Sequence, residues 1–260
     1  MSLQQTLAKA STSPDSGLIG KWEPKGIEKD EETAEFIIDL EGIASNKGKK
    51  EQVRVGYEGL DTDQRERIRK RINEKYKPKL DQLKRQYPEQ AEHIEAILNY
   101  LLNNLDKISL IDYHPLLQGY ADKNHILVNK DIFDLLTSSD ELTQDAAFAA
   151  LFHEAGHSYF DLKEFPENLK SQGLNVHTYL RGLGKGARTG QRSLTQAELA
   201  LPSGLGLQDV LFGEEVNDEL TRLIAKQKQI EKILQKEATE EILKKARLEQ
   251  NKEAKETLEQ

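Results

Sequence analysis

A stretch near the middle of the chain, Ala146 to Phe160, is apolar around nearly all sides of a helix. A helix with this pattern is buried rather than lying on the surface. Ser138 followed by Glu141 forms a capping-box pattern that would start the helix, and it must end before Pro166, which disfavours helical geometry in the preceding residue. The pattern therefore predicts one central helix around which the chain is organised.

Shorter patterns on either side of this helix predict a mixture of strands and helices. Strands are predicted at 35–40, 52–57, 108–111 and 124–128, with a hairpin turn at 46–48 between the first two. The segment 35–40 could equally continue a helix from Lys29. Helices are predicted at 61–76, 89–105, 130–136 and 208–236, with a break at Pro78 and a last helix to about residue 256, either continuous with 208–236 or separated from it by one break. The glycine-rich stretch 182–206 is interpreted as a mobile loop that could cover a site.

These elements predict an α+β fold that is predominantly α-helical, with a small sheet beside the central helix. Four segments follow: a flexible N-terminal tail (1–33) anchored by Trp22, a hairpin and helical segment (34–107), a core (108–236) and a C-terminal helix or tail (237–260).

The composition narrows the classes of partner and of metal site. The 260 residues carry a net charge of −8, which argues against nucleic acid as the main partner. The basic run 65–71 is interrupted by Glu66 and is better interpreted as a solvated helix face. Because the chain has no cysteine, a metal would have to be held by His, Asp or Glu.

No segment approaches the roughly 20 apolar residues that a membrane span needs. Residues 1–20 contain no apolar run that could serve as the core of a signal peptide. The default expectation is a cytoplasmic protein without a membrane span, although the sequence does not distinguish this location from secretion that needs no signal peptide. It gives no indication of oligomeric state.

The central helix contains the motif H-E-x-x-H, as His153-Glu154-Ala155-Gly156-His157. Histidines four residues apart lie on one helical face and can both bind one Zn²⁺, while the Glu between them serves as a general base. Ionisable side chains inside a buried helix are costly without a partner, and a metal would be the simplest partner for all three. The alternative interpretation is that His153 and His157 are core histidines whose ring nitrogens are satisfied by hydrogen bonds. It gives no reason for the presence of Glu154 on the same buried helix.

A catalytic zinc normally takes three protein ligands, so a third is expected downstream. His177, Asp161 and Glu164 are candidates, but the acidic helix start at 214–219 is the most attractive. Helical geometry favours Glu215 as the ligand, because it lies nearer the apolar stripe of that helix than Glu214 does. Glu219 would then hold a ligand in place, as Asp218 would if Glu214 were the ligand.

The order of strand, short helix and H-E-x-x-H helix resembles the catalytic core of the HtpX and CAAX-prenyl-protease family of gluzincins. The resemblance covers roughly residues 108 to 225 and implies that the core at 108–236 is a zincin-like metallopeptidase core. It further implies a zinc endopeptidase with His153 and His157 as ligands and Glu154 as base. It also departs from that family, which is usually membrane-embedded. An Asp four residues after the third ligand, as in that family, is present only if Glu214 is the ligand, whereas Glu215 with Glu219 is more similar to lethal-factor-type metallopeptidases.

The sequence therefore predicts a zinc metallopeptidase that hydrolyses a protein or peptide substrate with a metal-activated water. His177 and Tyr179 are possible donors to the oxyanion formed during hydrolysis. In zincins the substrate backbone can add to an edge strand above the active helix. The alternative hypothesis is a helical protein-interaction module with a structural or vestigial metal site.

Overall fold

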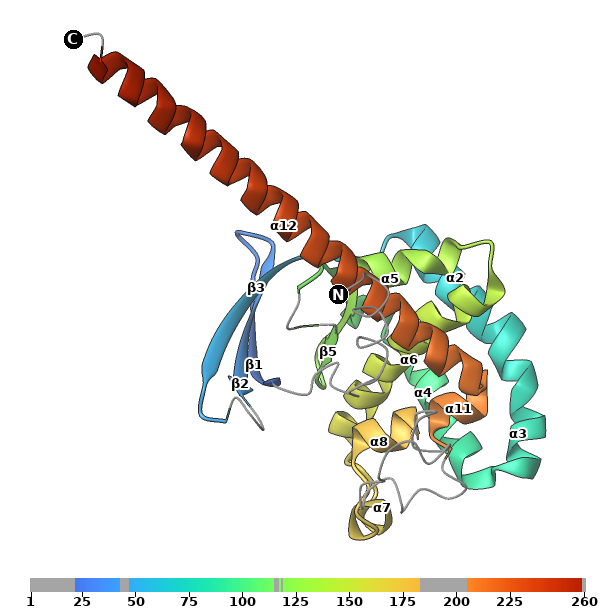
Figure 1. The fold of residues 1–260 in the computed structure, drawn as a ribbon. Helices are drawn as coiled ribbons and strands as arrows, with labels where there is room; N and C mark the ends of the chain where they lie inside the picture. The colour runs from blue at the N-terminus through green and yellow to red at the C-terminus, as the bar shows by residue number, and fades with distance from the viewer. Residues whose placement is uncertain (1–21, 43–46, 115–116, 118, 183–204, 259–260) are drawn as a thin grey trace, which may run out of the picture. The chain divides into compact units, whose positions relative to one another are not determined.

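The computed structural model describes residues 22–42, 47–114, 117, 119–182 and 205–258 (Figure 1). The chain divides into two compact units, Met1–Leu220 and Thr221–Gln260. The first unit contains the sheet and nearly all of the helices, and the second is formed by the outer part of one long helix. The α+β, mostly helical class predicted from the sequence is confirmed.

The sheet has six strands in the order β1-β2-β3-β4-β6-β5. The four predicted strands are present as β2 (Glu35–Gly42), β3 (Lys50–Gly59), β4 (Ile108–Ile111) and β6 (Ile126–Asn129), so the alternative of a helix from Lys29 is wrong. β4 and β6 run parallel and all other pairs are antiparallel. Because β3 pairs with β4, the predicted segments 34–107 and 108–236 share one sheet.

The other two strands, one at each edge of the sheet, were not predicted. β1 (Trp22–Asp30) lies in the predicted flexible tail, and it forms because its backbone pairs with β2 despite a polar sequence and a register shift between Pro24 and Gly26. β5 (Gly119–Ala121) lies in what was interpreted as a loop, and its three residues pair with β6. Backbone pairing of this kind leaves little trace in the side-chain pattern.

A cluster of buried apolar side chains joins the long hairpins to the rest of the sheet. Alternate residues of β2 and β3 supply most of it, as expected for strands with one buried face. Its members are Phe36, Ile38, Leu40, Val53, Val55, Ile111, Leu117 and Leu127. The face that they form fixes the register of β2 against β3.

The first helical segment begins as predicted. Asp61 caps α2 (Thr62–Arg71) in a capping box with Gln64, and η2 (Ile72–Tyr76) continues it. The predicted break at Pro78 is only a short turn, η3 (Lys77–Lys79), after which the chain continues as α3 (Leu80–Gln86). The predicted helix at 89–105 is α4 (Pro88–Asn103), followed by a turn at η4 (Leu105–Lys107).

After β6 come the short helix α5 (Lys130–Asp134) and the turn η5 (Leu135–Thr137). The central helix is α6 (Glu141–Lys163), which ends before Pro166 as predicted. Its cap is Asp140 rather than Ser138, because the Asp140 carboxylate accepts the backbone N–H of Thr143 at 2.8 Å. The Ser138 hydroxyl instead accepts the backbone N–H of Asp140.

Beyond α6 the chain forms more helices than predicted. α7 (Glu167–Ser171) and α8 (Val176–Arg181) precede the segment 183–204, so most of the glycine-rich stretch interpreted as a loop lies outside the described residues. α11 (Leu207–Phe212) ends at Gly213, where φ is +95°. α12 (Glu214–Leu258) then runs without a break. The predicted single helix at 208–236 is therefore divided at Gly213, and the predicted last helix is continuous with it.

α6 is the centre of the first unit, in contact with β5 and β6 of the sheet and with the helices α4, α5, α8 and α11 (Figure 1). Most of its inner residues are buried, including Phe148, Leu151, Phe152 and Ala155. Among the residues that the structure describes, no helix is long and apolar enough to cross a membrane.

Candidate metal centre

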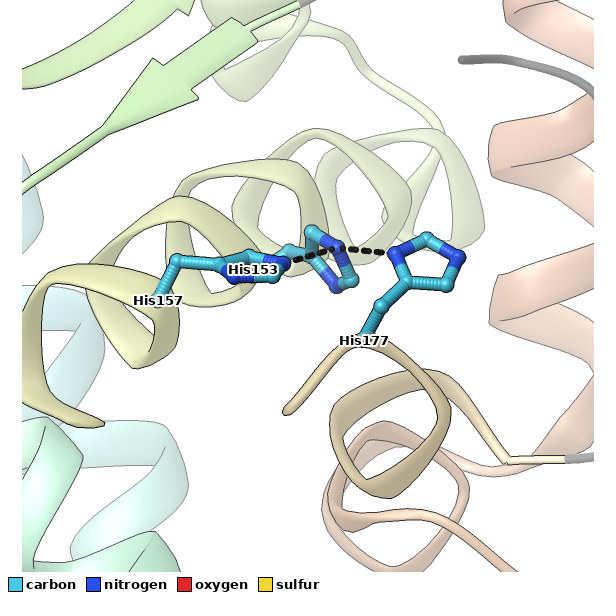
Figure 2. A group of neighbouring side chains, drawn as sticks. All are labelled: His153, His157 and His177. Carbon is cyan, nitrogen blue, oxygen red and sulfur yellow. Dashed lines mark hydrogen bonds between the residues drawn. The ribbon is translucent and has the colours of Figure 1, made fainter. Parts of the chain in front are cut away.

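Three histidine side chains from two helices converge beside α6 (Figure 2). His153 and His157 lie one turn apart on α6, and His177 lies in the first turn of α8. The Nε2 atom of His153 is 3.2 Å from Nε2 of His157 and 3.2 Å from Nδ1 of His177. In the described part of the chain, this is the group of side chains suited to hold a metal ion, with its ligand atoms all within 4.8 Å of one another.

Two of the separations between ring nitrogens fit tetrahedral coordination. Two nitrogens each about 2.0 Å from a zinc ion, at the tetrahedral angle, are about 3.3 Å apart. The separations of 3.2 Å from His153 Nε2 to His157 Nε2 and to His177 Nδ1 are close to that value. Imidazole nitrogens also suit copper, iron and nickel, so the donor set limits the metal to this class without selecting one member.

Burial keeps these imidazoles neutral. It lowers the pKa of His153 well below the ordinary value, and the neighbouring histidines add to the effect. The pKa values of His157 and His177 are lowered to about 4, mainly by burial. Arg181, at the end of α8, lowers the pKa of His177 further. A neutral imidazole carries a free lone pair, so all three rings are in the protonation state that metal binding requires.

A glycine on α6 allows α8 to come close enough for His177 to reach the pair. A Cβ atom at Gly156 would lie 2.4 Å from a methyl carbon of Leu180, which is itself fully buried on α8. Tyr179 holds the same helix from another side, since its hydroxyl lies 2.8 Å from Nδ1 of His93 on α4. The position of His177 therefore depends on how α8 packs against its neighbours.

Glu154 points toward the edge strand of the sheet. A Cβ atom at Gly119 of β5 would lie 2.6 Å from the Glu154 Oε1 atom, so only glycine lets the strand pass this close to the carboxylate. Burial raises the pKa of Glu154 to about 8. The carboxyl group is thus partly buried and lies close to the backbone of β5.

A buried glutamine from α11 contacts the first histidine. Gln208 is 1% exposed, and its Oε1 atom lies 3.1 Å from Nδ1 of His153. Its Nε2 group donates to the backbone carbonyl of Ala149 at 2.9 Å. Sequence reasoning did not identify Gln208, because no motif relates it to a helix about 55 residues earlier.

The predicted third ligand, Glu215, is not brought to the histidines. Glu215 and Glu214 are exposed in the first turn of α12, and the third side chain of the group that could hold a metal is His177. Glu219 is buried, but it contacts Thr143, whose hydroxyl donates to it at 3.5 Å near the start of α6. Thr143 is ten residues from His153, or about 15 Å along a helix. Glu214, Glu215 and Glu219 do not belong to the group of side chains that could hold a metal, and Asp218 is exposed.

The other candidates have different surroundings. Tyr179 is 2% exposed and its hydroxyl contacts His93, so it is not directed at the histidine group as an oxyanion donor would be. The Asp161 carboxylate accepts the backbone N–H of Lys123, and Glu164 is exposed at the end of α6. His177 was predicted as a possible ligand and as a possible oxyanion donor, and the structure places it in the group that could hold a metal. The helix that carries His177 could have been predicted from Asn175, because Asn is favoured at helix N-caps and Asn175 is the N-cap of α8.

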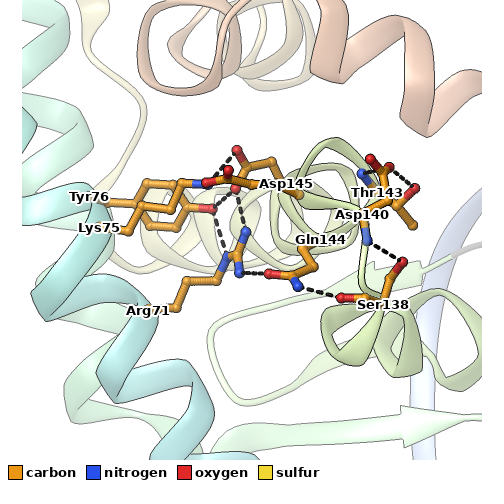
Figure 3. Close-up of polar contacts among 9 residues, drawn as sticks. Arg71, Lys75, Tyr76, Ser138, Asp140, Thr143, Gln144 and Asp145 are labelled. Carbon is orange, nitrogen blue, oxygen red and sulfur yellow. Dashed lines mark hydrogen bonds and ion pairs between the residues drawn. The ribbon is translucent and has the colours of Figure 1, made fainter.

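The opposite end of α6 is held by a network of buried charges (Figure 3). Asp145 accepts hydrogen bonds from Arg71 at 2.5 Å, from Tyr76 at 2.6 Å and from Lys75 at 2.8 Å. Arg71 also donates to Gln144. These bonds tie the start of α6 to α2 and η2, two turns before the histidines.

Comparison of the chain with protein-family models, with curated proteins and with solved structures returned no match.

Proposed function

We propose that this chain is a zinc-dependent metallopeptidase in which His153, His157 and His177 hold the metal and Glu154 is the general base. The observation that carries the proposal is the convergence of three neutral imidazoles, together with the partly buried carboxyl group of Glu154, which directly follows the first of them on the same helix. With His177 as third ligand the site departs from the gluzincin pattern expected from the sequence. The proposal therefore rests on the arrangement of these residues rather than on family membership.

The number of ligands favours a catalytic over a structural metal. Structural zinc is almost always held by four protein ligands, whereas catalytic zinc keeps one position for water or substrate. The group found in the described residues offers three ligand atoms. A fourth protein ligand would support the alternative of an interaction module with a structural metal.

A zinc ion in this position would supply Lewis acidity to activate water and to polarise a substrate carbonyl. The role of Glu154 is to accept the proton of the attacking water and to pass it to the leaving amine. Burial alone favours the protonated carboxyl group, but the charge of a nearby dication favours the carboxylate. Gly119 keeps the backbone of β5 close to this carboxyl group.

The edge position of β5 supports a peptide as the substrate. β5 is the last strand of the described sheet on this side, and it passes directly beside Glu154. An extended peptide could pair with its outer edge, with backbone hydrogen bonds supplying affinity for the main chain. The scissile carbonyl would then lie near the histidines.

Metal content tests the ligand assignment. We expect elemental analysis to find about one zinc per chain in the wild type and much less in His153→Ala and in His177→Ala. Glu215→Ala is the matched control and should keep its zinc, since Glu215 is exposed. Loss of zinc in Glu215→Ala with retention in His177→Ala would restore the ligand set predicted from the sequence and overturn this one.

Glu154→Gln tests the chemistry. The variant should bind zinc like the wild type and lose peptide hydrolysis, because its amide cannot accept the proton of the attacking water. Cleavage of a mixed peptide library, followed by mass spectrometry, measures the activity. Cleavage by Glu154→Gln at the wild-type rate would contradict the role of Glu154, and a fully closed four-ligand zinc site would favour the interaction module.

A further inference from the structure

Both polar atoms of the Gln208 side-chain amide make hydrogen bonds, one with a backbone carbonyl and the other with a histidine ring. Its Nε2 lies 2.9 Å from the carbonyl oxygen of Ala149, and its Oε1 lies 3.1 Å from Nδ1 of His153. The side chain is 1% exposed, so water does not compete for either bond.

The carbonyl of Ala149 determines which way the amide faces. A carbonyl oxygen can only accept a hydrogen bond, so the group next to it must be the NH₂ of Gln208. The opposite orientation would place two acceptors 2.9 Å apart in a buried position, which is costly. The Gln208 oxygen therefore faces His153.

The orientation of the amide in turn determines the state of His153. An amide oxygen can only accept, so Nδ1 of His153 must carry a hydrogen. In a neutral ring the other nitrogen, Nε2, then has a free lone pair. Nε2 is the atom that lies 3.2 Å from both of the other rings.

The helix that carries Gln208 is fixed independently of the histidines. Asp209 accepts the backbone N–H of Gly206 at 3.1 Å and the side-chain amide of Asn217 at 2.5 Å. Asn217 also donates to the carbonyl of Arg181 at the end of α8. A Cβ atom at Gly206 would lie 2.1 Å from the backbone nitrogen of Gly182, so the two backbones are in close contact. These contacts hold the end of α8, at Gly182, against the start of α11, at Gly206.

We propose that Gln208 is a positioning residue that holds His153 in its Nδ1–H tautomer, with the Nε2 lone pair directed at the metal position before any metal binds. The consequence for zinc affinity rests on the proposed function, whereas the tautomer itself does not. Removal of such an outer partner typically lowers metal affinity about 10- to 100-fold.

The direct test is nitrogen NMR of the full-length, metal-free, ¹⁵N-labelled protein, in which long-range proton–nitrogen correlations distinguish the two tautomers. His153 is assigned by comparison with His153→Gln. We expect the wild type to carry its hydrogen on Nδ1, and Gln208→Leu to shift His153 toward the Nε2–H tautomer. Zinc affinity, measured by competition with a chelating dye, should fall about 10- to 100-fold in Gln208→Leu.

Two further variants separate positioning from a general packing effect. Gln90→Leu is the matched control, because Gln90 is also a buried glutamine that donates to a backbone carbonyl, that of Leu205, near the start of α11. It should change neither the tautomer nor the zinc affinity. Gln208→Glu keeps an oxygen acceptor toward His153, and its carboxyl group when protonated also keeps a donor toward the Ala149 carbonyl, so it should retain the Nδ1–H tautomer. If Gln208→Leu does not fold, Gln208→Met, which likewise lacks the amide oxygen, takes its place.

The outcomes for the two proposals are distinguishable. An Nε2–H tautomer in the wild type, or a tautomer unchanged in Gln208→Leu, would overturn the role of Gln208 even if the protein binds zinc. An Nδ1–H tautomer that is lost in Gln208→Leu and regained in Gln208→Glu supports that role, even if no variant binds zinc and the proposed function fails.

Discussion

At the scale of single residues, the distance between Gly119 and Glu154 sets the position of the proposed base. A methyl group at residue 119 would lie 2.6 Å from the Glu154 Oε1 atom and 2.8 Å from its carboxyl carbon. Both are well inside van der Waals contact, so the carboxyl group would have to move. The three atoms nearest to such a methyl group all belong to Glu154.

Gly119→Ala should therefore lower peptide hydrolysis by roughly 100-fold while zinc content stays at the wild-type level, because displacement of a reacting group by about 1 Å can have such an effect. Cleavage rate and elemental analysis measure the two properties on one sample. The control is Gly59→Ala in β3, where an added Cβ would meet nothing within 4 Å. Equal loss of activity in both variants would indicate a general effect on the sheet instead.

The buried histidines also predict how the metal-free protein responds to pH. His157 and His177 have pKa values near 4 when folded, against 6.5 as the ordinary value. Between these values the unfolded chain binds more protons than the folded chain, so the free energy of unfolding decreases as pH falls from about 6.5 to 4. The loss is on the order of 2 kcal/mol per histidine between pH 6.5 and 5.

Urea denaturation of metal-free protein at pH 7 and pH 5 measures this loss. The double variant His157→Gln, His177→Gln should show a smaller difference in the free energy of unfolding between the two pH values, and an unchanged difference would contradict the assignment.

Asp145 contributes to stability in a separate pH range. Its hydrogen bonds to Lys75, Tyr76 and Arg71 hold its pKa below the ordinary 3.8 against the opposing effect of burial, so its stabilisation is present above pH 3.8 and is lost below it.

At the scale of elements, the site depends on the approach of α8 to α6. Sequence reasoning placed His153 and His157 on one helical face, and their rings do lie together, since residues on one helix have a fixed geometry. It favoured Glu215 over His177 as the third group beside the pair, because the sequence does not show where two separate helices pack. The exposed first turn of α12 is an acidic helix start, which the helix dipole favours without any ligand role.

Gly156→Ala tests the contact between these helices. The added Cβ would lie 2.4 Å from a Leu180 methyl carbon, so α8 should move away and carry His177 with it. We expect zinc affinity to fall by roughly 10-fold, since one ligand is displaced rather than removed. Dye competition measures the affinity.

The double variant Gly156→Ala, Leu180→Ala provides the matched comparison, because the smaller side chain at 180 makes room for the new methyl group. It should regain much of the zinc affinity, although it loses apolar burial and is less stable. A zinc affinity of Gly156→Ala equal to that of the wild type would show that α8 tolerates the methyl group without moving His177.

At the scale of the whole molecule, the residues of the candidate site all belong to the unit Met1–Leu220. Thr221–Gln260, the second unit, contributes none of the three histidines, nor Glu154 or Gln208. Its helix exposes Ile230 and Ile233, which are 48% and 57% exposed. Metal binding is therefore expected to be a property of the first unit.

A chain that ends at Lys236 should keep about one zinc per chain and the same zinc affinity as the full-length protein, as measured by elemental analysis and dye competition. This truncation keeps the buried Ile224 and removes only the outer part of α12. Loss of zinc from a truncated protein with an unchanged circular dichroism spectrum per residue would show that the removed part of α12 is needed for the site.

The sequence by itself determined what depends on neighbours along the chain. It indicated the buried helix with its H-E-x-x-H motif, the helix that begins at about residue 61, the end of α6 before Pro166 and four strands with clear apolar patterns. Each of these follows from local geometry, in which spacing along the chain fixes spacing in three dimensions.

Only the tertiary structure decided what depends on residues distant in sequence. β1 and β5 form because partner strands supply their hydrogen bonds, and β5 reaches Glu154 because residue 119 has no side chain. His177 reaches the histidine pair because Gly156 leaves room for α8, and Gln208 reaches His153 because α11 is tied to α8. Such contacts depend on how separate elements pack across the core. In a single sequence, the residues that make them are only isolated glycines and polar residues without a pattern that predicts the contact.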